Sequence, residues 1–169
     1  LGARFGRQIG LESCRLIKTF ESERGADGHY DVLTDILPTP QGERLLTAGY
    51  NGRVCEWDAE SGERLVSIQT DCGKIYGLVR LSNKEALCAG VDGDLLFIDL
   101  QEGIVRRRSP AHRLSIRDMA ICPRGCHLAT ISNDKSVQLF DSGGNPLWRF
   151  ETDLSLTAVE FSADGRSII

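Results

Sequence analysis

The chain has 169 residues, of which 41% are hydrophobic and 26% are charged, with a formal net charge of -4. No apolar run approaches the roughly 18 residues that a membrane helix needs, and the first twenty positions lack the apolar core of a signal peptide. The surface also lacks the basic bias of a nucleic-acid-binding domain. We therefore expect a soluble protein whose main partner is neither a membrane nor nucleic acid.

In chain order, the first complete unit covers residues 28–70. It contains four short apolar runs separated by Gly, Pro and Asn turns, a pattern that predicts one antiparallel sheet of four strands. Residues 71–109 repeat the pattern in degraded form, and residues 110–150 repeat it more fully. Residues 1–20 are expected to be the last two strands of a preceding unit, and residues 151–169 the start of a further one. No stretch has helical periodicity.

The units are related by a regular spacing. The segment LLTAGYNGRVCEWD ends at Asp58, and similar segments end at Asp99 and Asp141, which are 41 and 42 residues further along in turn. A period of this size, built from short β-rich units, is typical of a propeller or a solenoid. Because a lone four-stranded sheet is only marginally stable, the units are expected to stack on one another.

Two residue pairs mark the ends of the first unit, Gly28-His29 and Trp57-Asp58. The third unit has Ala111-His112 and Phe140-Asp141, and in both units the histidine precedes the aromatic residue by 28 positions. With these pairs the chain resembles the WD-repeat β-propeller family. The resemblance implies an all-β fold of four-stranded antiparallel blades. Since the chain opens on Leu1 and its one methionine is Met119, we expect a propeller fragment with an incomplete ring.

The resemblance also implies a hydrogen-bond network inside each blade, linking a histidine, a hydroxyl of the second strand, a turn aspartate and the tryptophan. In the first unit these positions hold His29, Thr47, Asn51 and Trp57. In the third unit they hold His112, Thr130 and Asp134, and the network is expected to end at Thr130 because Phe140 has no donor. The middle unit has no such set, so it must depend on packing, and we expect it to be the least stable blade.

Partner contacts in this family come from loops at one end of the propeller. The resemblance places the following residues there: Tyr50, Tyr76, Arg117, Lys74, Val32, Thr34, Val91, Ser115 and Asn133. Tyrosine and arginine are favoured at interfaces because they bury a large area and carry a polar tip. The first four residues of that set are therefore the strongest candidates.

We expect a non-enzymatic scaffold or adaptor that binds protein or peptide partners in a multiprotein complex. Asp134, His112 and Thr130 imitate a hydrolase triad, but they are expected to bond to one another inside the blade. The alternative is a sensory or regulatory propeller of a larger signalling enzyme, such as a nucleotide-binding ATPase or a kinase. No catalytic residue and no cofactor are expected.

Six cysteines are irregularly placed, which favours reduced thiols and a cytoplasmic location, with the nucleus as the alternative. The run from Cys122 to His127 suggests a metal or haem site. However, its cysteines are one residue too far apart for the usual haem attachment motif, and no second cysteine pair completes a zinc site. A plain hairpin without a metal is therefore the preferred interpretation.

Residues 103–117 contain five arginines and no acidic residue. A solvated outer strand is the preferred interpretation, and a site for phosphate or an acidic peptide is the alternative. Ser109, which follows three of these arginines, also resembles a basophilic kinase site.

Overall fold

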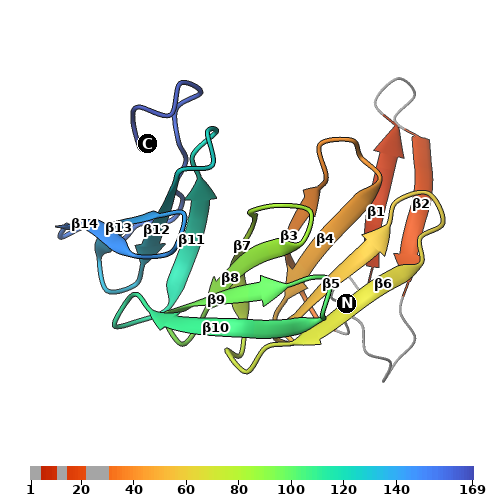
Figure 1. The fold of residues 1–169 in the computed structure, drawn as a ribbon, viewed down its shortest axis with the longest axis horizontal. Coiled ribbons are helices and arrows are strands. Elements are labelled where there is room, and N and C mark those ends of the chain that lie inside the picture. Colours follow the sequence, from red (N-terminus) through yellow and green to blue (C-terminus); the bar gives the residue numbers. More distant parts are fainter. Residues whose placement is uncertain (1–4, 11–14, 22–30) are drawn as a thin grey trace.

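The computed structural model describes residues 5–10, 15–21 and 31–169, the first two ranges by their backbone alone. Every regular element in these ranges is a β-strand, and twelve of the strands form three four-stranded antiparallel sheets (Figure 1). The predicted all-β fold is confirmed. A helix that could span a membrane is not found in the described ranges.

Each sheet is a simple meander in which consecutive strands pair. The first sheet contains β3 (Leu33–Pro38), β4 (Arg44–Gly49), β5 (Arg53–Asp58) and β6 (Arg64–Gln69). The middle sheet contains β7 (Ile75–Arg80), β8 (Glu85–Gly90), β9 (Asp94–Asp99) and β10 (Ile104–Pro110). The third sheet contains β11 (Ile116–Ile121), β12 (His127–Ser132), β13 (Ser136–Asp141) and β14 (Pro146–Glu151). A separate hairpin pairs β1 (Phe5–Gly10) with β2 (Arg15–Glu21).

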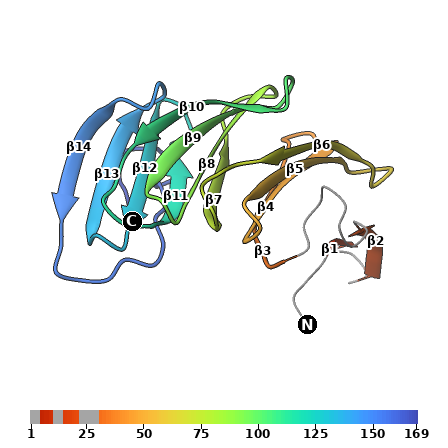
Figure 2. The same cartoon turned by 90° about the horizontal axis from the view of Figure 1, so that it is seen from below.

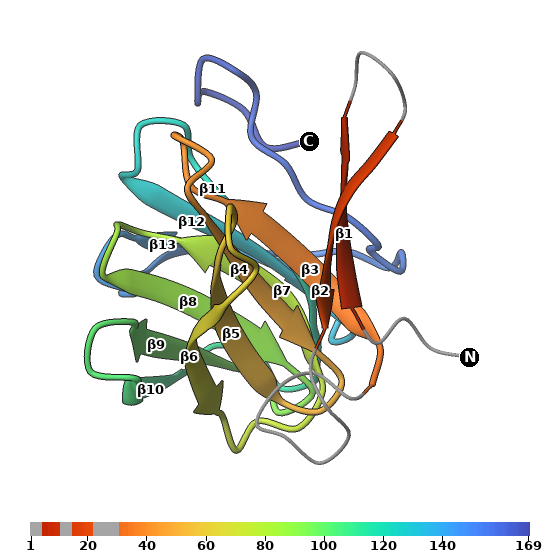
Figure 3. The same cartoon turned by 90° about the vertical axis from the view of Figure 1, so that its right-hand side faces the viewer.

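The three sheets stand side by side and fan out from their first strands. Strand β7 contacts both β3 and β11, so the first strands of neighbouring sheets line one common axis. Figure 2 shows the sheets as separate layers, and in Figure 3, which looks along the stack, they lie one behind another. Within the described part of the chain the sheets do not close into a ring, in agreement with the predicted propeller fragment.

Apolar side chains between the sheets form two main cores. One joins the first and middle sheets around Leu46, Ile75 and Leu78, and the other joins the middle and third sheets around Leu87 and Phe140. The middle sheet is therefore covered on both faces, and its strands β8 and β9 are almost wholly buried. The outermost strand of the third sheet, β14, is exposed along its whole length.

Carboxylates on the first strands reach across to the next unit. Asp35 Oδ2 accepts a hydrogen bond of 3.1 Å from the Leu78 N–H, and Asp118 Oδ2 accepts one of 2.9 Å from the Val159 N–H. The corresponding position on β7 is Gly77, against which Met119 packs so closely that an added Cβ would lie 2.6 Å from its Cγ. The junctions are thus polar where a carboxylate is present and purely steric where glycine replaces it.

Candidate functional site

Four side chains from three sheets form a continuous stack at the end of the molecule that carries the β4–β5 and β8–β9 turns. The Lys74 ammonium lies 4.7 Å from the centre of the Tyr50 ring, and the Tyr50 and Tyr76 rings meet edge to face with centroids 5.7 Å apart. The Arg117 guanidinium lies 4.7 Å from the centre of the Tyr76 ring. We call Tyr50, Lys74, Tyr76 and Arg117 the cation–aromatic cluster. These are the four residues for which the sequence predicted partner contacts most strongly.

Backbone hydrogen bonds fix the loops around this cluster in the same way in all three sheets. They run from Tyr50 N to Val32 O (2.9 Å), from Val91 N to Lys74 O (3.0 Å) and from Asn133 N to Ser115 O (3.0 Å). Six of the nine predicted face residues are therefore paired through their main chains. Thr34 lies on β3 at the position of Tyr76 and Arg117, and its hydroxyl is buried without a hydrogen-bond partner among the described residues.

The charges of the cluster are not compensated within the described residues. Lys74 and Arg117 are exposed and form no ion pair there, while the two tyrosines are half-buried. Cations held over aromatic faces gain about 0.5–1 kcal/mol each at exposed sites. The rings therefore help to hold two positive charges at the surface, available to an anionic group of a partner.

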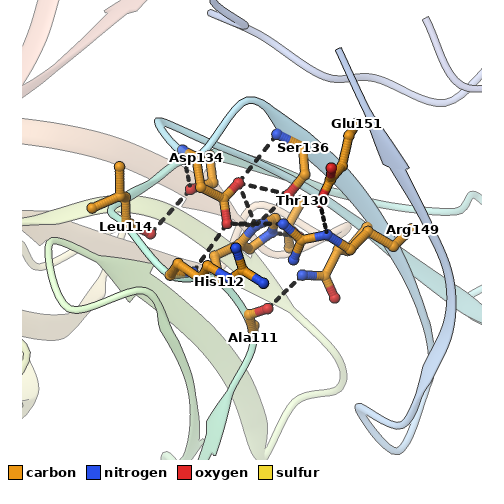
Figure 4. A network of polar contacts seen from close by, with 11 residues as sticks. Ala111, His112, Leu114, Thr130, Asp134, Ser136, Arg149 and Glu151 are labelled. Carbon is orange, nitrogen blue, oxygen red and sulfur yellow. Dashed lines mark hydrogen bonds and ion pairs between the residues drawn. The ribbon is translucent and has the colours of Figure 1, made fainter. Parts of the chain in front are cut away.

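The third sheet contains an extended polar network (Figure 4). The His112 side chain is fully buried, its Nε2 lies 2.7 Å from Thr130 Oγ1, and its Nδ1 lies 3.2 Å from both oxygens of Asp134. Ser136 Oγ donates to Asp134 Oδ1 over 2.6 Å and lies 3.0 Å from His112 Nδ1. The structure thus brings His112, Thr130 and Asp134 together, and Phe140 takes no part.

Proton positions follow from this geometry. With His112 neutral, Nδ1–H donates toward Asp134 and Nε2 accepts the Thr130 hydroxyl proton, so each polar atom has a partner. Burial lowers the pKa of His112 against the opposing pull of Asp134. Burial raises the pKa of Asp134, but hydrogen bonds from Ser136 and the Arg113 N–H, together with His112, outweigh it and hold that pKa well below its usual range. The polar side chains of His112, Thr130 and Asp134 are therefore hydrogen-bonded to one another inside the third sheet.

In the first sheet, Trp57 Nε1–H donates to Thr47 Oγ1 over 2.8 Å, and Thr47 Oγ1 donates to the Cys55 carbonyl over 3.3 Å. Asn51 Oδ1 accepts from the Arg53 N–H over 3.3 Å. His29, predicted to complete this network, lies outside the described residues.

In the middle sheet, two thiols occupy the place of the network. Cys88 stands on β8 where Thr47 and Thr130 stand on β4 and β12, and its buried thiol lies in the same apolar core as that of Cys72. The neighbouring Cys72 thiol, together with burial, raises the pKa of Cys88 well above its ordinary value, so the thiol stays protonated. Cys72 Sγ also lies 3.1 Å from Thr70 Oγ1.

The repeat spacing of the sequence puts Asp71 opposite His112, whereas the structure puts Thr70 there. Both Thr70 N and His112 N donate over 2.9 Å to the carbonyl of a turn glycine, Gly52 and Gly93 respectively. Thr70 lies five positions before Ile75, the first residue of β7, whereas His112 lies four positions before Ile116, the first residue of β11, so the structural counterpart is shifted by one position.

Several polar contacts were not predicted from the sequence. Ser136 and Arg149 join the network around Asp134, the latter at 3.4 Å, and the Gln138 amide donates to the Ala111 carbonyl. The buried Glu56 carboxylate pairs with Arg44 at 3.1 Å and with Arg80 at 2.9 Å. These residues lie at strand positions without a recurring repeat signal, so only the strand register reveals their contacts.

The arginines of β10 are engaged within the protein. Arg106 pairs with Asp99, Arg108 lies 3.0 Å from Asp92, and the Arg107 guanidinium lies 3.6 Å from the centre of the Phe97 ring. These contacts favour the outer-strand interpretation of the basic stretch over an anion site.

Comparison with known proteins supports the repeat interpretation. Residues 15–58 and 104–141 match the family described as WD domain, G-beta repeat. WD repeat-containing protein SL1-17 of Schistosoma mansoni is 30% identical over 132 residues, which are 78% of this chain and 42% of that protein.

Two further relatives are similar over a comparable part of the chain. NACHT and WD repeat domain-containing protein 2 of Homo sapiens is 28% identical over 141 residues, 79% of this chain and 8% of that protein. The U3 small nucleolar RNA-associated protein 4 homolog of Mus musculus is 25% identical over 134 residues, 78% of this chain and 19% of that protein. The chain therefore spans less than half the length of each of these relatives.

Proposed function

We propose that this chain, which belongs to the WD-repeat β-propeller family, is a non-enzymatic scaffold that binds a protein or peptide partner through the cation–aromatic cluster. WD-repeat proteins generally serve as protein-interaction scaffolds. The observation that carries the proposal is the contact of Tyr50, Tyr76, Lys74 and Arg117 across three sheets. A surface assembled from separate repeats exists only in the folded stack, so it suits recognition of a partner.

The chemistry of the cluster favours a partner segment that places an acidic side chain beside an apolar one. Lys74 and Arg117 offer positive charge at the two ends of the cation–aromatic cluster, and the tyrosine rings between them offer apolar area with polar tips. Because the rings already hold the cations, less side-chain entropy is lost on binding. Tyrosine and arginine are also the residue types most enriched among binding hot spots.

The proposal is tested by capture of partners from an extract of the source cells. The full chain is compared with a variant carrying Tyr50→Ala, Tyr76→Ala and Arg117→Ala, and recovered proteins are quantified by mass spectrometry. We expect the recovery of specific partners to be at least tenfold lower with the triple variant, since even one hot-spot residue contributes about 1.4 kcal/mol or more to binding. A peptide array graded in Asp and Glu content measures the acidic preference directly.

A matched control changes exposed charges at the end of the three sheets that lies opposite the cation–aromatic cluster. Lys84 precedes β8 and Arg124 lies in the β11–β12 turn, and both are exposed. A Lys84→Ala, Arg124→Ala variant is expected to recover the partners unchanged. Equal recovery by the chain and the triple variant, with both folded by circular dichroism, would count against this face.

A second candidate function is that of a regulatory propeller attached to a signalling enzyme, such as a nucleotide-binding ATPase or a kinase. The observation in its favour is the similarity to a protein whose name combines NACHT and WD repeat domains. Sequencing the complete transcript separates the two proposals, because a Gly-rich phosphate-binding loop upstream of Leu1 supports the enzyme-linked form.

A cytoplasmic location, with the nucleus as the alternative, is part of the same proposal. Five cysteines lie in the described ranges and all are free thiols, which suits a reducing compartment. Fluorescence imaging of the tagged full chain tests it, and secretion of the protein would contradict it.

A further inference from the structure

Three potential metal ligands meet in the hairpin that joins β11 to β12, at the end of the stack opposite the cation–aromatic cluster (Figure 1). They are Cys122, Cys126 and His127, and their ligand atoms all lie within 4.8 Å of one another. Cys122 is buried, His127 is half-buried and Cys126 is exposed. The group has no part in the proposed partner face.

The distances between the ligand atoms suit a metal ion with tetrahedral coordination. Cys122 Sγ lies 3.8 Å from Cys126 Sγ, and Cys126 Sγ lies 3.3 Å from His127 Nδ1. A zinc ion bound to two thiolates at about 2.3 Å separates the sulfurs by about 3.8 Å at the tetrahedral angle. The two sulfurs therefore stand at the separation expected for two thiolates that bind the same zinc ion.

The hairpin holds these ligands in place. Cys122 N donates to the His127 carbonyl over 2.8 Å, and Gly125 N donates to the Cys122 carbonyl over 2.7 Å. Gly125 has a φ of 70°, a left-handed conformation that closes the turn. On its buried side Cys122 packs against Gly165, where an added Cβ would lie 2.8 Å from Sγ.

In two equivalent hairpins a residue with a hydroxyl group stands at the position of Cys122. The Thr39 hydroxyl accepts from the Arg44 N–H over 3.1 Å, and the Ser162 hydroxyl accepts from the Ser167 N–H over 3.0 Å. Cys122 replaces that turn-stabilising hydroxyl with a weakly hydrogen-bonding sulfur that faces a second thiol instead. This exchange of a hydroxyl for a thiol, together with the second cysteine and the histidine, is specific to the third sheet.

We infer that Cys122, Cys126 and His127 bind one thiophilic metal ion of the Zn²⁺ class, with water at the fourth position. Two thiolates, which are soft ligands, and an imidazole, which suits zinc, select such ions over Ca²⁺ or Mg²⁺, which prefer oxygen ligands. The exposed side of Cys126 gives the ion a path from solvent, and three protein ligands leave one coordination position for water. The sequence alone argued against a metal because the spacing fits no usual motif, whereas the turn brings the adjacent His127 to the two thiols.

The test titrates the reduced, metal-free full chain with Co²⁺, whose thiolate complexes absorb strongly. We expect a thiolate-to-metal absorption that saturates at one equivalent and disappears when Zn²⁺ is added. Cys126→Ser removes an exposed ligand without disturbing the core, so this variant is expected to fold and to lose the absorption. Arg124→Ala, in the same turn, is the matched control and is expected to keep it.

Two results overturn the inference. One is a reduced chain that gives no absorption at one equivalent, or an absorption that persists in Cys126→Ser. The other is a Cys122–Cys126 disulfide, identified by peptide mass after air oxidation, in a chain whose reduced form does not bind Co²⁺. That outcome would make the pair a redox site instead of a metal site.

Discussion

Cys88 in the middle sheet and Thr130 in the third sheet occupy the same strand position, yet their surroundings differ. Thr130 is hydrogen-bonded to a buried histidine that is in turn held by Asp134, whereas Cys88 lies with Cys72 in the apolar core between the first and middle sheets. The middle sheet packs against a four-stranded sheet on each face, whereas the outer face of the third sheet packs only against the segment that contains Leu156, Val159 and Ile168. A sheet that is covered on both faces can therefore dispense with the polar network that a neighbouring sheet retains.

The two sheets also differ at the last residue of the second strand, and this leads to the largest expected effect. In the third sheet Ser132 donates through its hydroxyl to the Leu114 carbonyl over 3.0 Å. In the middle sheet Gly90 stands there, and an added Cβ would lie 1.9 Å from the Lys74 carbonyl oxygen. Gly90→Ala is expected to destabilise the sheet by about 3 kcal/mol, because backbone must move to make room. Hydrogen exchange of peptides covering β8 and β9 measures the loss.

The matched change in the third sheet is Ser132→Ala, which removes the hydrogen bond to the Leu114 carbonyl and the one from the Asp134 N–H and is expected to cost about 2 kcal/mol. If Gly90→Ala costs no more than this, the middle sheet is not held together by close packing, and the contrast between the two sheets fails.

The second-largest expected loss of stability comes from the polar network around His112. His112 joins two sheets, because its N–H donates to Gly93 of the middle sheet and its side chain bonds to Thr130 and Asp134 of the third. His112→Ala leaves these buried partners unsatisfied and is expected to cost about 2–3 kcal/mol. Exchange protection of β12 and β13 should fall accordingly.

Thr70 is the counterpart of His112 one sheet earlier, with its hydroxyl donating to the Gly52 carbonyl over 2.8 Å. Thr70→Ala is expected to cost only about 1 kcal/mol, since it removes that hydrogen bond and a weak contact with Cys72 Sγ. Equal losses for the two variants would show that the histidine network adds nothing to the backbone clamp that both positions share.

The sequence was sufficient for the strands and for part of the network, because turn glycines and the spacing of His112, Thr130 and Asp134 recur with the repeat. It was not sufficient for Ser136 or Arg149, whose contacts depend on the register of β13 and β14. The sequence named each residue of the cation–aromatic cluster singly, but the packing of neighbouring sheets creates their mutual contacts. The proximity of Cys122, Cys126 and His127 depends on the local turn geometry around Gly125, and the spacing of these residues in the sequence does not reveal that geometry.

The smallest effect is a loss of stability on mild acidification that is confined to the third sheet. Burial depresses the pKa of His112 below its ordinary value of 6.5, so the unfolded chain binds a proton more readily than the folded one. The stability contributed by neutral His112 is present above pH 6.5 and is lost as the pH falls from there toward the folded pKa. Protection factors of β12 and β13 should therefore decrease between pH 7.5 and 5.5, while those of β8 and β9 stay constant. In His112→Ala the decrease should disappear, and a decrease that persists would mean that another group controls it.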